Sequence, residues 1–577
     1  MTLRTLLCAL PLLASASACR SASSRGAAPG DGAFLRLAHE VLEDAYRRSP
    51  TNATALGIHT HDEELEDFSA GAIAADLSRA RDFATRLAAL DPAALSLDQR
   101  LDLEFLRHQI DAEILQLDVI RGWARDPDGY SSTITNSAYV VMKRSFAPPA
   151  ERLRLLVARE RKMPALLAQA RANLKNPPKI LTQIAIEQID GNRAFFEQDL
   201  PLAFADVADE KLQADFRSSN AAVLAALADY KTWLEHELLP RSTGSFALGA
   251  DTYAKLLAAT EMVDVPLERL LAVAEADRQR NEAMLVETAR AIDPSKGVDE
   301  VLHAVEAEHP APAVLLATTQ AALDSLRAFL VEKDTVTIPR SAPARVQETP
   351  PFLRSTTSAS MDTPGPFETR ATEAFYNMTL PDPRWPGAEQ EDFMRQWYTA
   401  AISNVSVHEV YPGHYLQFLY AKEFPTDVRK VFGANTNSEG WAHYSEQMML
   451  DEGLHAGEPR FRLAQLQDAL LRDVRFIAGI RLHTQGMTIE QAQQLFERAG
   501  HQPAPVALSE AKRGANDPLY GYYTMGKLAI LKLRDDYRAK TGAAFTLREF
   551  HDAFVRMGPL PLPLVREKML GERGNLF

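Results

Sequence analysis

The chain has 577 residues, of which 46% are hydrophobic and 24% charged, a composition typical of a soluble globular protein. Its formal net charge of -14 and its pI near 5.6 argue against nucleic-acid binding, which requires a basic surface. The two cysteines, Cys8 and Cys19, both lie near the N-terminus. The body of the chain therefore excludes disulfides, a cysteine nucleophile and cysteine metal ligands.

The N-terminus has the features of an export signal. Residues 1–18 carry one early basic residue, an apolar run and then small residues, which predicts a signal peptide. The ending "ASAC" is similar to a bacterial lipobox, with cleavage before Cys19 and lipid on its thiol, although Ala16 stands where Leu is usual. Residues 19–32 then form a flexible tether. We expect a periplasm-facing lipoprotein of the cell envelope, and the alternative is plain secretion to the periplasm. Arg20, in place of Asp, favours the outer membrane.

The rest of the chain is predicted to be mainly α. Apolar residues recur at three-and-four spacing through residues 33–333, for example in "LSRARDFATRLAALD". Residues 334–383 are rich in Pro, Thr and Ser and contain β-like pieces such as "EAFYNMTL". Helical periodicity returns in residues 384–577. This pattern predicts a large helical protein with two halves around a cleft, joined by a small strand-and-loop segment. We expect no second apolar span, so the membrane would be contacted only through the N-terminal lipid.

The stretch "SVHEVYPGHYLQF" begins as a zinc metallohydrolase helix does, with His408 and Glu409. A second histidine is usual four residues after the first, but here that position is Pro412, and the next histidine is His414. On a regular helix, residues six apart point roughly 120° away from each other. Proline disrupts the helix and Gly413 relaxes the backbone, so we expect a kink that returns His414 to the face of His408.

A second stretch, "NSEGWAHYSEQMM", offers a third ligand. Glu439 follows His414 by 25 residues, and it shares one helical face with His443 and Glu446. Three protein ligands leave a position for water, which defines a catalytic zinc site. Two alternatives remain at this point. His443 could bind the metal, with Glu439 then supporting it, and Glu446 is likewise a candidate supporting residue or alternative ligand. Alternatively, each residue could have an ordinary structural role, such as a carboxylate at a helix start.

These motifs resemble those of the DUF885 family, bacterial and often lipoprotein-like proteins related to helical gluzincin zinc metallopeptidases. The matching residues are His408, Glu409, Pro412, Gly413 and His414, followed by Glu439, Gly440, Trp441 and Ala442. Segments such as "SPTNATALGIHTHDEELEDFS" and "YGYYTMGKLAILKLRDDYR" are also similar, so the resemblance covers most of the mature chain. It strengthens the expectation of a zinc peptidase without naming a substrate.

The mechanism expected is hydrolysis of a peptide bond with one Zn²⁺ per chain, held by His408, His414 and Glu439. Glu409 is the expected general base. Tyr523 is the first candidate to stabilise the oxyanion, with Tyr522 and His483 next. Candidate substrate contacts are Arg475, Tyr522, His483 and Lys527, which could bind a peptide carboxylate or polar group. Tyr376 is a further candidate, because its strand could pair with an extended peptide. The alternatives are a non-catalytic, metal-containing binding lipoprotein and a zinc hydrolase of esters or non-peptide amides.

Overall fold

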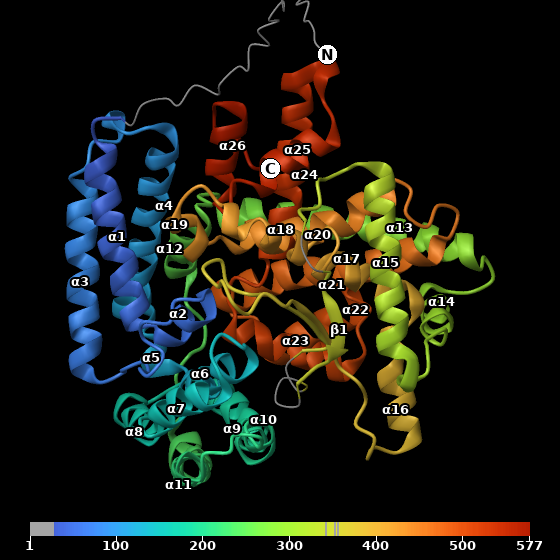
Figure 1. Cartoon of the computed structure of the whole chain (residues 1–577). Coiled ribbons are helices and arrows are strands. Elements are labelled where there is room, and N and C mark those ends of the chain that lie inside the picture. Colours follow the sequence, from blue (N-terminus) through green and yellow to red (C-terminus); the bar gives the residue numbers. More distant parts are fainter. Residues whose placement is uncertain (1–27, 341–342, 351–353, 355–356) are drawn as a thin grey trace, which may run out of the picture.

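The structure is a computed structural model that describes residues 28–340, 343–350, 354 and 357–577. The fold is mainly α, as the periodicity predicts, with one small sheet between residues 345 and 378 (Figure 1). The predicted signal peptide and Cys19 lie outside the described residues. The first helix begins at Asp31, inside the range predicted to be a tether.

The helices before the sheet are α1 (Asp31–Arg48), α2 (Pro50–Leu56), α3 (Ala70–Ala88), α4 (Leu97–Ile114), α5 (Gly122–Arg125), α6 (Asp128–Lys143), α7 (Pro149–Glu160), α8 (Met163–Asn173), α9 (Lys179–Ala194), α10 (Leu200–Ala203), α11 (Glu210–Trp233), α12 (Ala250–Glu261), α13 (Leu267–Ile292), α14 (Val298–Glu306) and α15 (Leu315–Lys333). Three of them are followed directly by π-helical turns, η2 (Leu115–Ile120), η3 (Phe195–Asp199) and η4 (Leu234–Leu238).

The helices after the sheet are α16 (Gly387–Met394), α17 (Thr399–Glu409), α18 (His414–Leu419), α19 (Asp427–Val431), α20 (Asn435–Asp451), α21 (Pro459–Thr484), α22 (Ile489–Ala499), α23 (Ala504–Asn516), α24 (Tyr522–Thr541), α25 (Leu547–Val555) and α26 (Leu562–Leu570).

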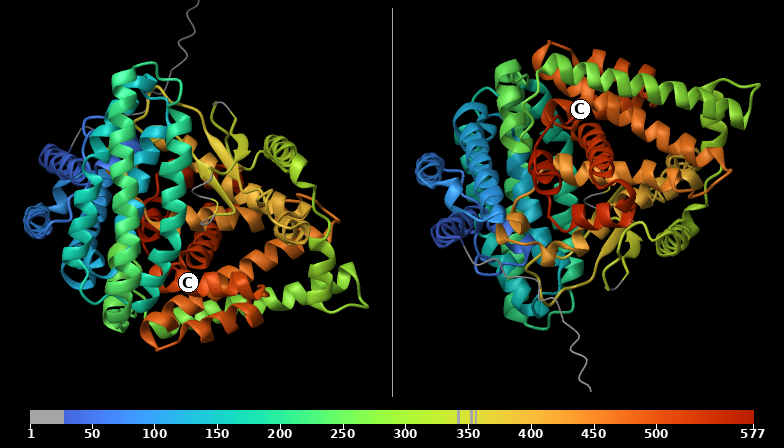
Figure 2. Two further views of the ribbon diagram at one scale, coloured as in Figure 1. Left: turned by 90° about the horizontal axis from the view of Figure 1, so that it is seen from below. Right: turned by 90° about the horizontal axis from the view of Figure 1, so that it is seen from above.

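The core does not divide at the predicted segment boundary. The largest cluster of buried apolar side chains runs from Phe34 to Leu576 and draws on both ends of the chain. A second cluster is built within residues 130–238. The long helix α13 packs along α21, and the two lie side by side in both views of Figure 2. Part of the predicted N-terminal half is thus structurally joined to the C-terminal helices.

The sheet has three strands, β1 (Arg345–Glu348), β2 (Ala359–Asp362) and β3 (Phe375–Met378), in the order β1-β3-β2. β3, predicted from "EAFYNMTL", is the central strand: it is parallel to β1 and antiparallel to β2. Tyr376 pairs with Val346 on one side and with Met361 on the other. The expectation that its strand could accept an extended peptide is therefore wrong, because both edges of β3 are occupied.

One helical segment, Pro312–Lys333, is long and apolar enough to cross a membrane by length and composition alone. This helix departs from the expectation that no second apolar span is present. In the structure, α15 packs against α17 and β1, and its residues Leu315, Leu323, Leu326 and Leu330 belong to the main core.

Candidate metal centre

The expected interruption of the His-Glu helix is present. α17 ends at Glu409 and α18 starts at His414, with a cis peptide bond between Tyr411 and Pro412. In the turn between the helices, the Gly413 N–H donates to the Val407 carbonyl at 3.0 Å, a bond that spans six residues instead of four. The wide turn therefore accommodates the extra residues, and a new helix begins at His414.

Gly413 is required by this turn. A Cβ atom at position 413 would lie 1.7 Å from the His408 carbonyl oxygen, far inside any contact distance. Trp441 holds the turn from the other side, because its indole N–H donates to the Pro412 carbonyl at 2.8 Å. The Pro-Gly pair and the tryptophan of the second motif thus belong to one local structure.

The turn brings three side chains from two parts of the chain together. His408 and His414 meet edge to face, with ring centroids 4.9 Å apart. The Nε2 atoms of both rings lie 3.3 Å from the same atom, Oε2 of Glu439 on α20. That oxygen is buried and accepts no well-directed hydrogen bond from any described residue. The three side chains therefore converge on a common point.

Glu446 lies two turns after Glu439 on α20 and contacts His408 through the ring nitrogen that does not face Glu439. Its carboxylate accepts a 2.7 Å hydrogen bond from His408 Nδ1, so Nε2 is the ring nitrogen that faces Glu439. It also contacts His443 Nδ1 at 3.2 Å and Arg472 at 3.1 Å. The structure thus places Glu439, and not His443, beside both histidines, while Glu446 and His443 lie behind them.

The electrostatics of the cluster follow from burial and pairing. Burial opposes the imidazolium form of His408, but Glu439 and Glu446 outweigh it and raise its pKa to about 9. Burial would raise the pKa of Glu446, yet the charge of Arg472 holds it well below its usual range. Burial lowers the pKa of His443 to about 3, so this ring is neutral. The centre therefore combines two carboxylates with a His408 ring whose imidazolium form is favoured and a neutral His443 ring.

Glu409 lies at the end of α17, beside the cluster and next to the sheet. Its carboxylate accepts a hydrogen bond from the backbone N–H of Met361 on β2, and burial raises its pKa. Tyr376 approaches Glu409 and Ser406 from the central strand. The Tyr376 side chain is fully buried, so it supports α17 from inside the protein.

The tyrosines of α24 cover another side of the centre. The Tyr523 ring lies 6.2 Å from the His408 ring and 4.8 Å from the Tyr522 ring. The Tyr522 hydroxyl donates to Asp517 at 3.1 Å. Burial, followed by the neighbouring Tyr523 and Asp517, raises the Tyr522 pKa.

Three residues predicted to contact the substrate are instead bonded to other groups of the protein. Arg475 makes two 2.7 Å hydrogen bonds to Glu510. Lys527 is fully buried and lies 3.0 Å from Asp277. His483 is hydrogen-bonded to the Gly514 carbonyl at 2.8 Å, and its ring packs against Phe246 and Tyr253. The structure does not bring Lys527 or His483 to the cluster, and Arg475 reaches it only through the Tyr523 ring.

Two arginines at the centre were not singled out from the sequence. Arg472 contacts Glu446 and lies 5.6 Å from the Tyr523 ring. Its position three residues before Arg475 on one helix was a usable signal. Arg513 approaches the hydroxyl groups of Tyr522 and Tyr523 at 3.5 and 3.3 Å. No local pattern marks Arg513, because α23 is brought there by tertiary packing.

The donor set fits a zinc ion. Two ligands at about 2.1 Å from a tetrahedral ion lie about 3.4 Å from each other. Both nitrogen-to-oxygen distances here are 3.3 Å, and one ligand atom from each residue falls within 4.8 Å of the others. Two imidazoles and one carboxylate are also the ligand types that zinc prefers in catalytic sites.

Comparisons with known proteins agree with this fold and these motifs. Residues 50–569 match the family described as "Bacterial protein of unknown function (DUF885)". The chain belongs to the DUF885 family. No curated protein matches it.

Two solved structures share the DUF885 fold over nearly their whole length. One is a candidate lipoprotein of unknown function from Shewanella oneidensis, which is 25% identical with a TM-score of 0.78, covering 93% of this chain and 99% of that one. The other is a candidate lipoprotein from Colwellia psychrerythraea, 17% identical with a TM-score of 0.80, covering 94% and 99%.

Proposed function

We propose that this DUF885 protein is a zinc-dependent peptidase. The observation that carries the proposal is the convergence of His408 and His414 on one carboxylate oxygen of Glu439, at distances that match ligands around a tetrahedral ion. A bound zinc ion would supply a Lewis acid and lower the pKa of water toward neutrality.

The chain's own residues can perform the remaining steps. Glu409 would take a proton from the attacking water and pass it to the leaving amine. The Met361 N–H holds one side of that carboxylate. Tyr523 lies over the centre as a donor for the developing oxyanion. Glu446 keeps His408 in the tautomer that a ligand needs.

The proposed location is the cell envelope, with a lipid on Cys19. Support comes from the "ASAC" sequence and from the two structural neighbours that are described as candidate lipoproteins. Mass spectrometry of the protein from membranes would detect the lipid, and a Cys19→Ala variant should release the protein in soluble form.

Metal content and hydrolysis together test the proposed activity. The wild type and Glu409→Gln should each carry about one zinc per chain, and His414→Ala should carry none. Of these three proteins, only the wild type should cleave members of a peptide library. His39→Ala, which changes an exposed histidine far from the cluster in sequence, is the control and should retain both properties.

The outcomes separate the alternatives. Zinc retained in His414→Ala would contradict the ligand assignment. Full activity in Glu409→Gln would contradict the general base. A wild type that binds zinc and cleaves acyl esters but no peptide would identify an esterase. A wild type without zinc, even after zinc is supplied, would favour a binding protein.

A further inference from the structure

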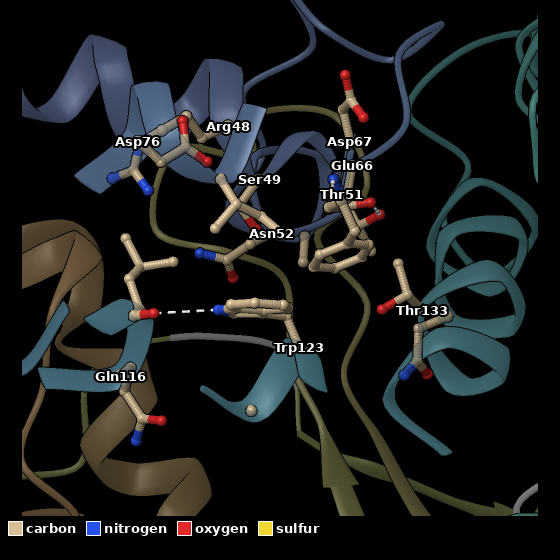
Figure 3. Close-up of a pocket in the computed structure, with 16 residues that line it drawn as sticks. Arg48, Ser49, Thr51, Asn52, Glu66, Asp67, Asp76, Gln116, Trp123 and Thr133 are labelled. Carbon is tan, nitrogen blue, oxygen red and sulfur yellow. Dashed lines mark hydrogen bonds between the residues drawn. The ribbon is translucent and has the colours of Figure 1, made fainter. Parts of the chain in front are cut away.

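A separate cavity of about 530 Å³ lies in the N-terminal helices, lined by residues from the end of α1 to α3 and from η2 to α6. We call it the Trp123 pocket. Figure 3 shows Trp123 at its centre, with Asn52 and Gln116 on opposite sides of the indole in that view. None of the residues that line it belongs to the candidate metal centre.

Trp123 presents a fixed and open aromatic face. Its indole N–H donates to the Leu117 carbonyl at 3.0 Å, which anchors the ring. Trp233 and Trp441 each stack on another ring, and Trp385 meets one edge to face. For Trp123, no ring or cation of the described chain covers the indole. The same side chain lines a second cavity of about 560 Å³, so Trp123 lies between two cavities.

The polar side chains of the pocket that have no hydrogen-bond partner among the described residues are uncharged: the hydroxyl of Ser49 and three amides. Asn52, Gln116 and Asn136 are exposed, and none of these side chains is hydrogen-bonded to another described residue. Each amide can donate and accept hydrogen bonds.

The charged groups of the pocket are already paired. Arg48 binds Asp44 and Glu113. Glu66 accepts hydrogen bonds from the backbone and hydroxyl of Thr51. The other two acids, Asp67 and Asp76, are likewise engaged, with Gln169 and Arg79. The lining contains three carboxylates and one guanidinium, so it disfavours an anionic ligand.

We propose that the Trp123 pocket binds a neutral saccharide. Sugar hydroxyl groups both donate and accept hydrogen bonds, as the three amides do, and the C–H face of a sugar ring can lie on the open indole. A peptide is less suited, because the walls are mostly helices whose backbone groups are paired internally, with one loop at residues 66–68, and no free strand edge is present in this part of the structure. The pocket does not involve the proposed metal ligands, so the inference is independent of the proposed function.

Calorimetric titration of the full chain tests this inference. The probes are N,N′-diacetylchitobiose and maltotriose, with triglycine for comparison. We expect at least one saccharide to bind, with an affinity that changes little between low and high salt because no ion pair is formed. Asn52→Ala and Gln116→Ala should each weaken binding about fivefold, the effect of one lost hydrogen bond.

Gln198→Ala is the matched control. Gln198 is also an exposed glutamine in a π-helical turn, η3, but it lies outside the pocket. It should bind the saccharide like the wild type. Circular dichroism and melting temperature establish that each variant is folded, and Gln116→Ala decides the question if Asn52→Ala does not fold.

Three results would overturn the inference. One is the absence of binding by both saccharides at millimolar concentration. Another is unchanged affinity in both amide variants. The third is binding of triglycine that the two amide variants weaken, which would make the pocket a peptide site.

Discussion

Glu446 connects the candidate centre to the interior of the protein. It accepts from Nδ1 of His408 and is held in turn by Arg472. Such a carboxylate fixes both the rotation and the tautomer of a ligating imidazole. Glu446→Gln keeps the size of the side chain but removes the charge and replaces one acceptor oxygen with a donor.

We expect Glu446→Gln to lower zinc affinity about 10- to 100-fold, measured by competition with a chelator. Asp451→Asn, at the exposed end of the same helix, should bind zinc like the wild type. Unchanged affinity in Glu446→Gln would show that His408 needs no carboxylate partner.

Glu160 predicts a pH dependence of stability far from the centre. It is fully buried at the end of α7, and its partners are the neutral side chains of Ser219 and Asn220. Burial raises its pKa to about 7 from the usual 4.5. The folded state then binds this proton more tightly than the unfolded state, so stability falls as pH rises through the range from 4.5 to about 7.

Glu160→Gln should remove this loss. We expect the variant to be more stable than the wild type by up to about 3 kcal/mol at pH 8.5 and by little at pH 4, measured by urea unfolding. Glu63→Gln, at an exposed position, should leave the pH profile unchanged. A Glu160→Gln profile parallel to the wild type would contradict the prediction.

Local spacing was enough to predict that His408, His414 and Glu439 meet. The six-residue interval from His408 to His414 contains its own turn, and Glu439 lies on a regular helix, so both are properties of short segments. The assignments of Lys527 and Arg475 depended on partners far along the chain, Asp277 and Glu510, which no local pattern reveals.

Two glycines set the distance between α20 and α24. A Cβ atom at Gly440 would lie 2.5 Å from Gly526 Cα, and one at Gly526 would lie 2.0 Å from the Thr436 carbonyl oxygen. The helices therefore cross with their backbones in contact. This crossing places Tyr523 of α24 over His408 while α20 supplies Glu439.

Gly526→Ala should force the two helices apart. We expect a loss of about 1–3 kcal/mol in the free energy of unfolding, together with reduced activity because Tyr523 is displaced. Gly71→Ala is the control: a Cβ there meets nothing within 4 Å, so the change should be neutral or slightly stabilising. Equal stability of the two variants would contradict close packing at Gly526.

The sequence predicted individual helices and strands better than it predicted how they are arranged. The strand at Phe375–Met378 follows from local signals. The central place of that strand does not, because strand order depends on pairing between residues that lie 13 to 30 positions apart in the sequence.

A buried ion pair joins one helix of the N-terminal half to one helix of the C-terminal half. Arg429 of α19 donates to Asp102 of α4 at 2.6 Å, and both side chains are inaccessible to solvent. Arg429 also contacts Asp98 on the same helix. The N-terminal helices are thus fixed to the C-terminal part by a guanidinium that is buried away from water and depends on these protein partners.

Arg429→Met should destabilise the whole fold by about 3–5 kcal/mol, because it leaves Asp102 buried without a cation. The double variant Arg429→Met with Asp102→Leu should recover part of the loss. Lys255→Met removes an exposed pair with Asp251 and should change stability by less than about 1 kcal/mol. Urea unfolding measures all three, and a loss in Arg429→Met no larger than in Lys255→Met would contradict the prediction.

The boundary near residue 334 marks a change in composition and not in packing. α15 ends at Lys333, one residue before the predicted crossing, but α13 and α15 both pack against helices of the C-terminal half. Periodicity identifies helices, whereas the choice of neighbours depends on which apolar faces fit together, and that information is spread over the entire chain.

The missing side chain at Gly413 has a consequence for how a metal would enter. The turn that aligns the two histidines is held by backbone hydrogen bonds and by the indole of Trp441, so the proposed ligands would be aligned before any ion binds. A preorganised site of this kind lets one divalent ion replace another without refolding. Cobalt could then serve as a visible reporter of the ligand geometry in an otherwise unchanged protein.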